Sequence, residues 1–213
     1  HHSAAMTTPS LQIAMNELSN HDHSRFLTRT NKKVGRVNTM GCEAANQGVN
    51  KAVMREAVAI QMTWPGAPTI YYGDEAGVCG FTDPDNRRTY PWGHEDQDLI
   101  DFHREMIRIH KENQELLTGS IKKAAGDYNF ISYARFNKQE QCLIVVNNGY
   151  NDVTKDILVW EFGIPRDCKL VRLMLTSNSG FTVEKEEYNV VAGKLTLTLP
   201  PTSVIVLKHY KEM

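Results

Sequence analysis

The sequence predicts an α/β segment followed by an all-β segment, with the change near Leu117. Before that residue, two short apolar runs alternate with two amphipathic stretches, in the order strand, helix, strand, helix. This order favours parallel strands joined by crossover helices. After it, short runs rich in Thr, Val, Ile and Tyr follow one another without helices, which is typical of an antiparallel sandwich. We therefore expect domains over residues 1–117 and 118–213.

In the first segment we expect the tail of a helix over residues 7–14, strands over 15–20 and 68–72, and helices over 48–62 and 96–113. The run 68–72 lacks alternation, which suits a parallel strand covered on both faces. Both longer helices carry apolar residues at three- and four-residue steps. These residues are Val49, Val53, Ala57 and Ile60 in the first helix, and Leu99, Phe102, Met106 and Ile109 in the second.

Seven short strands are expected in the second segment, over residues 119–125, 128–136, 141–147, 153–160, 169–176, 194–199 and 203–209. Turn residues such as Asn-Gly, Gly and Pro separate them. The first segment instead has two long connections, over 27–47 and 73–93, which are long enough to be functional loops.

Composition excludes several classes of function. The 213 residues are 41% hydrophobic and 23% charged, with a net charge of −1, which gives no electrostatic case for nucleic acid or an anionic membrane. No apolar run reaches the roughly 18 residues of a membrane span. The four cysteines form no C-x-x-C pair, so they indicate neither zinc nor a redox motif. We expect free thiols, with one disulfide left open, and a cytoplasmic location.

The chain opens with HHSAAM and shows no signal-peptide pattern. His1 and His2 are either tag residues or the end of a native helix. Because polar motifs arrive within the first 22 residues, we expect the chain to begin in mid-fold.

Polar side chains follow both expected strands of the first segment. Asn20, His21 and Asp22 come after the first strand, and Gly-Asp-Glu at 73–75 comes after the second. In α/β barrels the carboxyl ends of the strands carry the chemistry. One alternative is a simple turn with a satisfied His and a capping Asp. Another is a metal pair of His21 and His23, which share a face but have no third ligand spaced nearby; otherwise His23 is an exposed loop residue.

Taken in order, four segments resemble the end of the alpha-amylase family of glycoside hydrolases (family 13), of the neopullulanase, cyclomaltodextrinase or bacterial alpha-amylase type. Residues 20–25 resemble the region that closes the seventh barrel strand, 66–75 the eighth strand and its loop, and 83–87 the sugar-binding loop that follows. Residues 200–207 resemble the last strand of the C-terminal sandwich. The resemblance implies a C-terminal fragment of a (β/α)8 barrel followed by an antiparallel Greek-key β-sandwich.

The resemblance also implies roles for particular residues. Asp22 corresponds to the catalytic carboxylate that neither attacks nor protonates but stabilises the cationic sugar ring of the transition state. His21 would hydrogen-bond the same sugar, and Asp83 and Arg87 would bind sugars further from the cleavage point. Arg25 is expected behind the site, pairing with one of its carboxylates and lowering that carboxylate's pKa. A simple loop salt bridge is its alternative.

Other polar and aromatic residues near these motifs have structural interpretations. Residues 83–86 can form an Asx turn with Pro84. We interpret Asp74 and Glu75 as groups that shape the loop rather than as an acid pair. Trp64 and Trp92 could stack on sugar rings, but the flanking prolines favour packed turn positions.

Retaining glycosidases need a nucleophile and an acid/base carboxylate about 5 Å apart. The resemblance places these two groups on the fourth and fifth strands, and a full barrel takes roughly 250 residues. We therefore expect the C-terminal portion of a retaining hydrolase of α-1,4-glucans such as starch and maltooligosaccharides, inactive alone. The expected partners are an α-glucan, the rest of the barrel and another copy of the chain. No cofactor or metal is expected.

The alternative function is a non-catalytic carbohydrate-binding or interaction module. Such a module would need exposed aromatic side chains on the sandwich. The candidates are Tyr128, Tyr150 and Trp160, although strand alternation gives Trp160 an equal chance of lying in the core.

Overall fold

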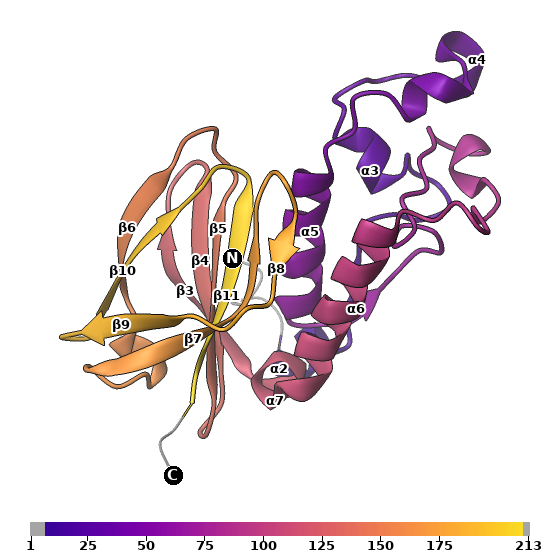
Figure 1. Ribbon diagram of the computed structural model, residues 1–213. Helices are drawn as coiled ribbons and strands as arrows, with labels where there is room; N and C mark the ends of the chain where they lie inside the picture. Colours follow the sequence, from indigo (N-terminus) through magenta and orange to yellow (C-terminus); the bar gives the residue numbers. More distant parts are fainter. Residues whose placement is uncertain (1–6, 211–213) are drawn as a thin grey trace.

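The computed structural model describes residues 7–210 and divides into a helical layer beside a curled antiparallel sheet (Figure 1). His1 and His2 lie outside the described residues. None of the helices described is long and apolar enough to cross a membrane.

The first part of the chain has the expected order of strand, helix, strand and helix. Its main elements are α2 (Thr8–Gln12), β1 (Met15–Glu17), α5 (Lys51–Thr63), β2 (Ala67–Thr69), α6 (Gln97–Glu112) and α7 (Gln114–Thr118). Strands β1 and β2 pair in parallel, with Met15 opposite Ala67 and Glu17 opposite Thr69. The predicted parallel pairing is therefore confirmed.

Side-chain caps fix where the two long helices begin. The Asn50 side chain accepts hydrogen bonds from the backbone N–H groups of Ala52 and Val53, at 2.9 and 3.3 Å. In α6, the Asp96 carboxylate accepts from the Leu99 N–H at 3.3 Å. Each cap satisfies N–H groups that have no partner within the helix. The four apolar residues predicted for α6 are all buried, which confirms that face of the helix.

Helix α5 is more deeply buried than its apolar spacing indicated. The predicted residues Val53, Ala57 and Ile60 are only half-buried, whereas Arg55, which lies on another face, is almost completely buried. The Arg55 guanidinium donates to Asp98 Oδ2 at 2.8 Å and to the Ser177 carbonyl at 3.1 Å. The helix lies between α6 and the curled sheet, so packing surrounds more of it than a single amphipathic stripe predicts.

The two long connections of the first part contain short helical turns. These are α3 (Phe26–Arg29), α4 (Val37–Met40), η1 (Cys42–Ala45) and η2 (Asp85–Arg87). Elements of three or four residues are too short to show a helical period in the sequence. Helix α4 projects away from the rest of the molecule (Figure 1).

The second part is all β, as predicted. Its strands are β3 (Ser120–Gly126), β4 (Phe130–Phe136), β5 (Gln141–Asn147), β6 (Val153–Leu158), β7 (Cys168–Thr176), β8 (Phe181–Thr182), β9 (Glu187–Val191), β10 (Lys194–Leu199) and β11 (Ser203–His209). The short strands β8 and β9 were not expected. All pairings are antiparallel, in the order β3-β4-β5-β11-β7-β9-β10-β6, with β8 on β7.

The curled sheet encloses one core and presents a second apolar face to the helices. Its inner core includes Phe130, Leu143, Ile157 and Leu195, from opposite halves of the sheet, as in a sandwich. Tyr133, on the other face of β4, hydrogen-bonds Thr63 Oγ1 at 2.6 Å. Buried residues of α5, α6 and the sheet form one cluster at this junction. The sheet therefore supports the helical layer through this cluster. The same packing fixes the position of the loops at the opposite end of the helical layer.

Candidate active site

Asp22 and His21 lie in an exposed turn just after β1, at the carboxyl end of the parallel sheet. Their side chains are 68% and 61% exposed, and His21 Nε2 lies 3.4 Å from Asp22 Oδ1. The segment is not helical, and the aspartate is not packed against apolar neighbours. This geometry leaves the carboxylate free to meet a ligand from solvent.

The side chain of Asn20 holds this turn from within. Its Oδ1 atom accepts hydrogen bonds from the backbone N–H groups of Asp22 and His23, at 2.9 and 3.1 Å. Its Nδ2 atom donates to Glu17 Oε1 at 2.7 Å. The residues therefore form an Asx turn, and the capping group is Asn20 rather than Asp22.

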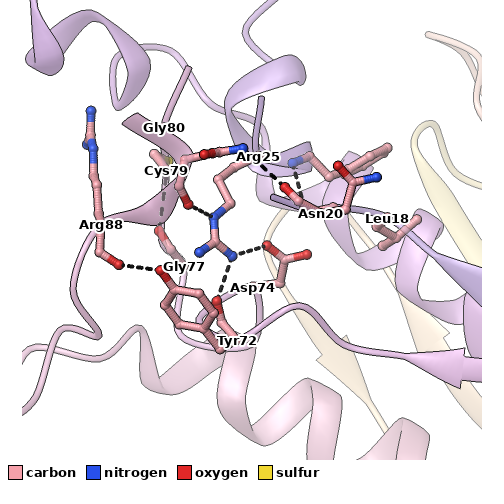
Figure 2. Close-up of polar contacts among 12 residues, drawn as sticks. Leu18, Asn20, Arg25, Tyr72, Asp74, Gly77, Cys79, Gly80 and Arg88 are labelled. Atoms are coloured by element: carbon pink, nitrogen blue, oxygen red, sulfur yellow. Dashed lines mark hydrogen bonds and ion pairs between the residues drawn. The ribbon is translucent and has the colours of Figure 1, made fainter. Parts of the chain in front are cut away.

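Arg25 lies completely buried beneath the turn and joins three segments (Figure 2). Its Nη1 atom donates to the Tyr72 carbonyl at 2.6 Å and to Asp74 Oδ1 at 3.1 Å, and its Nε atom donates to the Asn86 carbonyl at 2.8 Å. The guanidinium carbon also lies 4.0 Å from the ring centroid of Tyr71. These contacts use both the planar fork and the aromatic stacking that distinguish arginine from lysine.

The carboxylate that pairs with Arg25 is Asp74, not Asp22. Burial raises the pKa of Asp74, and this effect outweighs the hydrogen bond to Ser19 and the charge of Arg25, which lower it. The structure thus agrees with the loop salt bridge that was the alternative for Arg25, and with Asp74 as a group that shapes its loop. Arg25 itself follows the turn of Asp22, and its contacts join that turn to the loop after β2. Any effect of Arg25 on the site therefore acts through the position of these two segments.

Asp83 and Arg87 form an ion pair in the loop after β2, with both side chains about half-exposed. The hydrogen bond to Asp83 is the main cause that raises the pKa of Arg87, and the charges of Tyr71 and Asp22 add to it. Asp22 therefore lies within electrostatic reach of Arg87. The two loops bring together the residues that the resemblance assigned to sugar binding.

Two residues that organise the second loop were missed. The Asp85 carboxylate accepts a hydrogen bond from the Phe81 N–H at 2.7 Å. It also accepts from Arg88 Nε at 3.0 Å and from Arg88 Nη2 at 2.9 Å. The contact with Phe81 reaches back along the chain and is not the Asx turn expected over residues 83–86, and the Asp83 carboxylate instead pairs with Arg87. Arg88 also reaches Asn46 Oδ1 at 2.9 Å and the Cys42 carbonyl at 2.7 Å, which ties the segment before α5 to this loop. The three-residue spacing of Asp85 and Arg88, which suits an ion pair, was the one sign of this contact in the sequence.

Asn86 was missed as well, and no feature of the sequence indicated its role. It is fully buried, and its Nδ2 atom donates to the carbonyls of Asn20 and His23, at 3.2 and 2.8 Å. It therefore connects the loop after β2 with the turn that carries Asp22.

The aromatic residues divide between packed and exposed positions. Trp64 is partly covered and lies 5.2 Å from Tyr133, ring centroid to ring centroid. The packed position expected for Trp92 is wrong, because its side chain is 79% exposed and contacts the Tyr90 ring. On the sandwich, Tyr128 and Tyr150 are strongly exposed.

Within residues 7–210, no group of three or more His, Cys, Asp or Glu side chains could hold a metal ion. The histidine pair therefore gains no third ligand from the fold. The four cysteines are free thiols, as expected.

The fold and the loops define an α/β segment with polar turns after its parallel strands, followed by an all-β domain. Comparison with family models identifies both parts: residues 2–163 match the alpha amylase catalytic domain, and residues 121–210 match the alpha amylase C-terminal all-beta domain. The chain belongs to the alpha-amylase family. The two matches overlap, so the division at residue 117 stays a prediction, although α7 ends at Thr118 and β3 begins at Ser120.

Curated relatives are enzymes named for their action on α-glucans. The chain is 39% identical over 127 residues to an amylopullulanase of Thermoanaerobacter thermohydrosulfuricus, which covers 60% of this chain and 8% of that protein. It is 33% identical over 196 residues to neopullulanase 2 of Thermoactinomyces vulgaris, covering 90% of this chain and 28% of the relative. The chain thus spans less than a third of either relative.

Solved structures agree with this assignment. A debranching enzyme from Nostoc punctiforme, in its native form, superimposes with a TM-score of 0.71 at 25% identity, covering 95% of this chain and 37% of that one. An alpha-amylase from Geobacillus thermoleovorans, complexed with acarbose, gives a TM-score of 0.72 at 20% identity, covering 95% and 40%. The second likeness supports the fold alone.

Proposed function

We propose that the chain is the C-terminal portion of a retaining α-amylase-type glycoside hydrolase that acts on α-1,4-glucans. Its relatives include an amylopullulanase and a neopullulanase, whose names favour an α-glucan as substrate. In this proposal Asp22 stabilises the transition state, His21 binds the same sugar, and Asp83 and Arg87 bind sugars further along the chain.

The observation that carries the proposal is the exposed Asp22 carboxylate at the end of β1, beside His21 and within electrostatic reach of Arg87. Positive charge develops on the sugar ring only in the transition state, so a carboxylate fixed there stabilises the transition state more than the ground state. The Asx turn of Asn20 and the buried Arg25 hold the turn in place, which limits the reorganisation needed during reaction.

The proposal assigns the nucleophile and the acid/base to other strands of the barrel. The described residues form one pair of parallel strands, β1 and β2, whereas the resemblance places those two carboxylates on the fourth and fifth strands. We therefore expect this chain to be inactive alone and to need the remaining barrel units as its partner.

A recombination assay tests this proposal. The chain is mixed with a separately made N-terminal remainder of the catalytic domain, and maltooligosaccharide hydrolysis is measured. We expect activity only in the mixture, and its loss by a factor of about 100 or more on Asp22→Asn. The control is Asp156→Asn, an exposed aspartate on the sandwich. Hydrolysis by the chain alone, or full activity with Asp22→Asn, would contradict the proposal.

One observation favours the second candidate, a non-catalytic carbohydrate-binding module. Tyr128 and Tyr150 are 96% and 80% exposed and line one hollow of about 290 Å³ on the sandwich. Binding of maltooligosaccharide that survives changes at His21 and Asp22, but disappears on truncation of these tyrosines, would support this function instead.

A further inference from the structure

The two loops of the candidate active site are joined by one buried side chain. Asn86 lies between Asp83 and Arg87 in the sequence, and none of its surface is exposed. Its Nδ2 atom donates to the Asn20 carbonyl at 3.2 Å and to the His23 carbonyl at 2.8 Å. These two carbonyls flank His21 and Asp22, so the amide of Asn86 holds the turn from outside while Asn20 holds it from within.

Both contacts of the Asn86 side chain use its N–H groups. The Oδ1 atom is buried and has no hydrogen-bond partner among the residues described. The neighbouring acceptors are carbonyl oxygens, so only a group with two donors on one atom can serve both. Aspartate has no N–H, serine has one donor, and glutamine is longer by a methylene group.

The backbone around Asn86 is equally constrained. Its carbonyl accepts from Arg25 Nε at 2.8 Å. Gly80 approaches so closely that a Cβ atom there would lie 2.8 Å from the Asn86 Cα atom. The same glycine accepts a hydrogen bond from the Arg25 N–H, at 2.9 Å. Asn86 therefore has a fixed position from which to orient the turn.

We infer that Asn86 is a positioning residue that sets the Asp22 carboxylate relative to Arg87 in the sugar-binding site. The inference rests on the proposed function, because it assigns to Asn86 the geometry of residues that we propose to bind the glucan. Asn86 lies between Asp85 and Arg87 in η2. Movement of the turn against this loop would therefore change the distance between the Asp22 carboxylate and the Arg87 guanidinium.

The substitution Asn86→Asp tests the donor role, because it preserves the shape of the side chain but replaces the N–H groups by a carboxylate. At about pH 7.5 an ionised carboxylate would face two carbonyl oxygens, and we expect the affinity for maltoheptaose to fall about tenfold or more. Burial beside carbonyls raises the pKa of the introduced carboxyl, so at about pH 5.5 it should be protonated and donate one hydrogen bond. Affinity relative to the unsubstituted chain should then recover in part, because one of the two hydrogen bonds returns and the charge is removed.

Two measurements and one control make the result decisive. Maltoheptaose affinity is measured by calorimetry at both pH values, and amide hydrogen exchange is followed at Asp22 and His23. The control Asn148→Asp makes the same change at an exposed position on the sandwich and should affect neither measurement. Faster exchange at both amides in Asn86→Asp, reversed at the lower pH, is the expected result.

Two outcomes would overturn the inference. One is affinity and exchange unchanged by Asn86→Asp, since that would show that Asn86 fills space without a role for its donors. The other is a loss of affinity without faster exchange at Asp22 and His23, since the effect would then not pass through the turn. If the unsubstituted chain binds no maltoheptaose, the proposed function fails for the isolated chain. Amide exchange then decides the role of Asn86 by itself, because it needs no ligand.

Discussion

Glu56 on α5 is a buried carboxyl group with an unusual environment. Its side chain is almost completely covered, its Oε1 atom has no hydrogen-bond partner among the described residues, and burial raises its pKa from 4.5 to about 8. The folded state therefore binds this proton more tightly than the unfolded state. Its contribution to stability is fully present below pH 4.5 and is lost as the pH rises toward 8.

Replacing Glu56 by Gln should remove this dependence on pH. We expect Glu56→Gln to raise the free energy of unfolding by roughly 1–3 kcal/mol at about pH 8.5 and to change it little near pH 4.5. Urea unfolding at both pH values measures the effect. The exposed Glu43→Gln provides the control. If the free energy of unfolding changed with pH equally in the unsubstituted chain and in Glu56→Gln, the carboxyl would be hydrated or paired in solution.

At the scale of elements, the loops after β1 and β2 are held together mainly by Arg25. Arg25→Lys keeps the charge but loses the planar fork that reaches Tyr72, Asp74 and Asn86. We expect a loss of about 2–4 kcal/mol in stability, measured by denaturant unfolding. The exposed ion pair of Arg104 and Asp101 gives the matched control, Arg104→Lys, with an expected change under about 1 kcal/mol. Equal effects of the two substitutions would contradict this role.

The regular helices and strands could be predicted from the sequence, whereas the short turns and the long-range contacts could not. The helices α5 and α6 and most sandwich strands follow local periods, so their approximate ranges were predictable, and the order strand, helix, strand, helix predicted the parallel pairing of β1 with β2. Helical turns of three or four residues and the two-residue strand β8 carry no such period and were missed. The contacts of Asn86 with the turn at residues 20–23 join segments more than 60 residues apart, which a local pattern cannot reveal.

At the scale of the whole molecule, the parallel sheet is incomplete among the described residues. Strands β1 and β2 pair only with each other there, and Met15 and Ile13 are exposed near the open edge, beside the half-buried face of α5. Unpaired parallel edges and exposed apolar patches promote association. This arrangement suits a chain that packs against further barrel units.

We therefore expect the isolated chain to self-associate at micromolar concentration, as measured by light scattering. Met15→Lys should shift the distribution toward monomer, because it places a charge at the open edge. The control Val34→Lys, at a residue that is 98% exposed and distant from that edge in sequence, should leave the distribution unchanged. A monodisperse monomer of the unsubstituted chain would argue against an open interaction face.

In the proposed function, a glucan binds across the turn of Asp22 and the loop of Arg87. The most direct measurement is a map of backbone amide NMR shifts as maltoheptaose is added to the chain. We expect the affected amides to lie within residues 20–25 and 83–88, and Asp22→Asn to weaken the response. Shifts confined to the sandwich turns around Tyr128 and Tyr150 would contradict it.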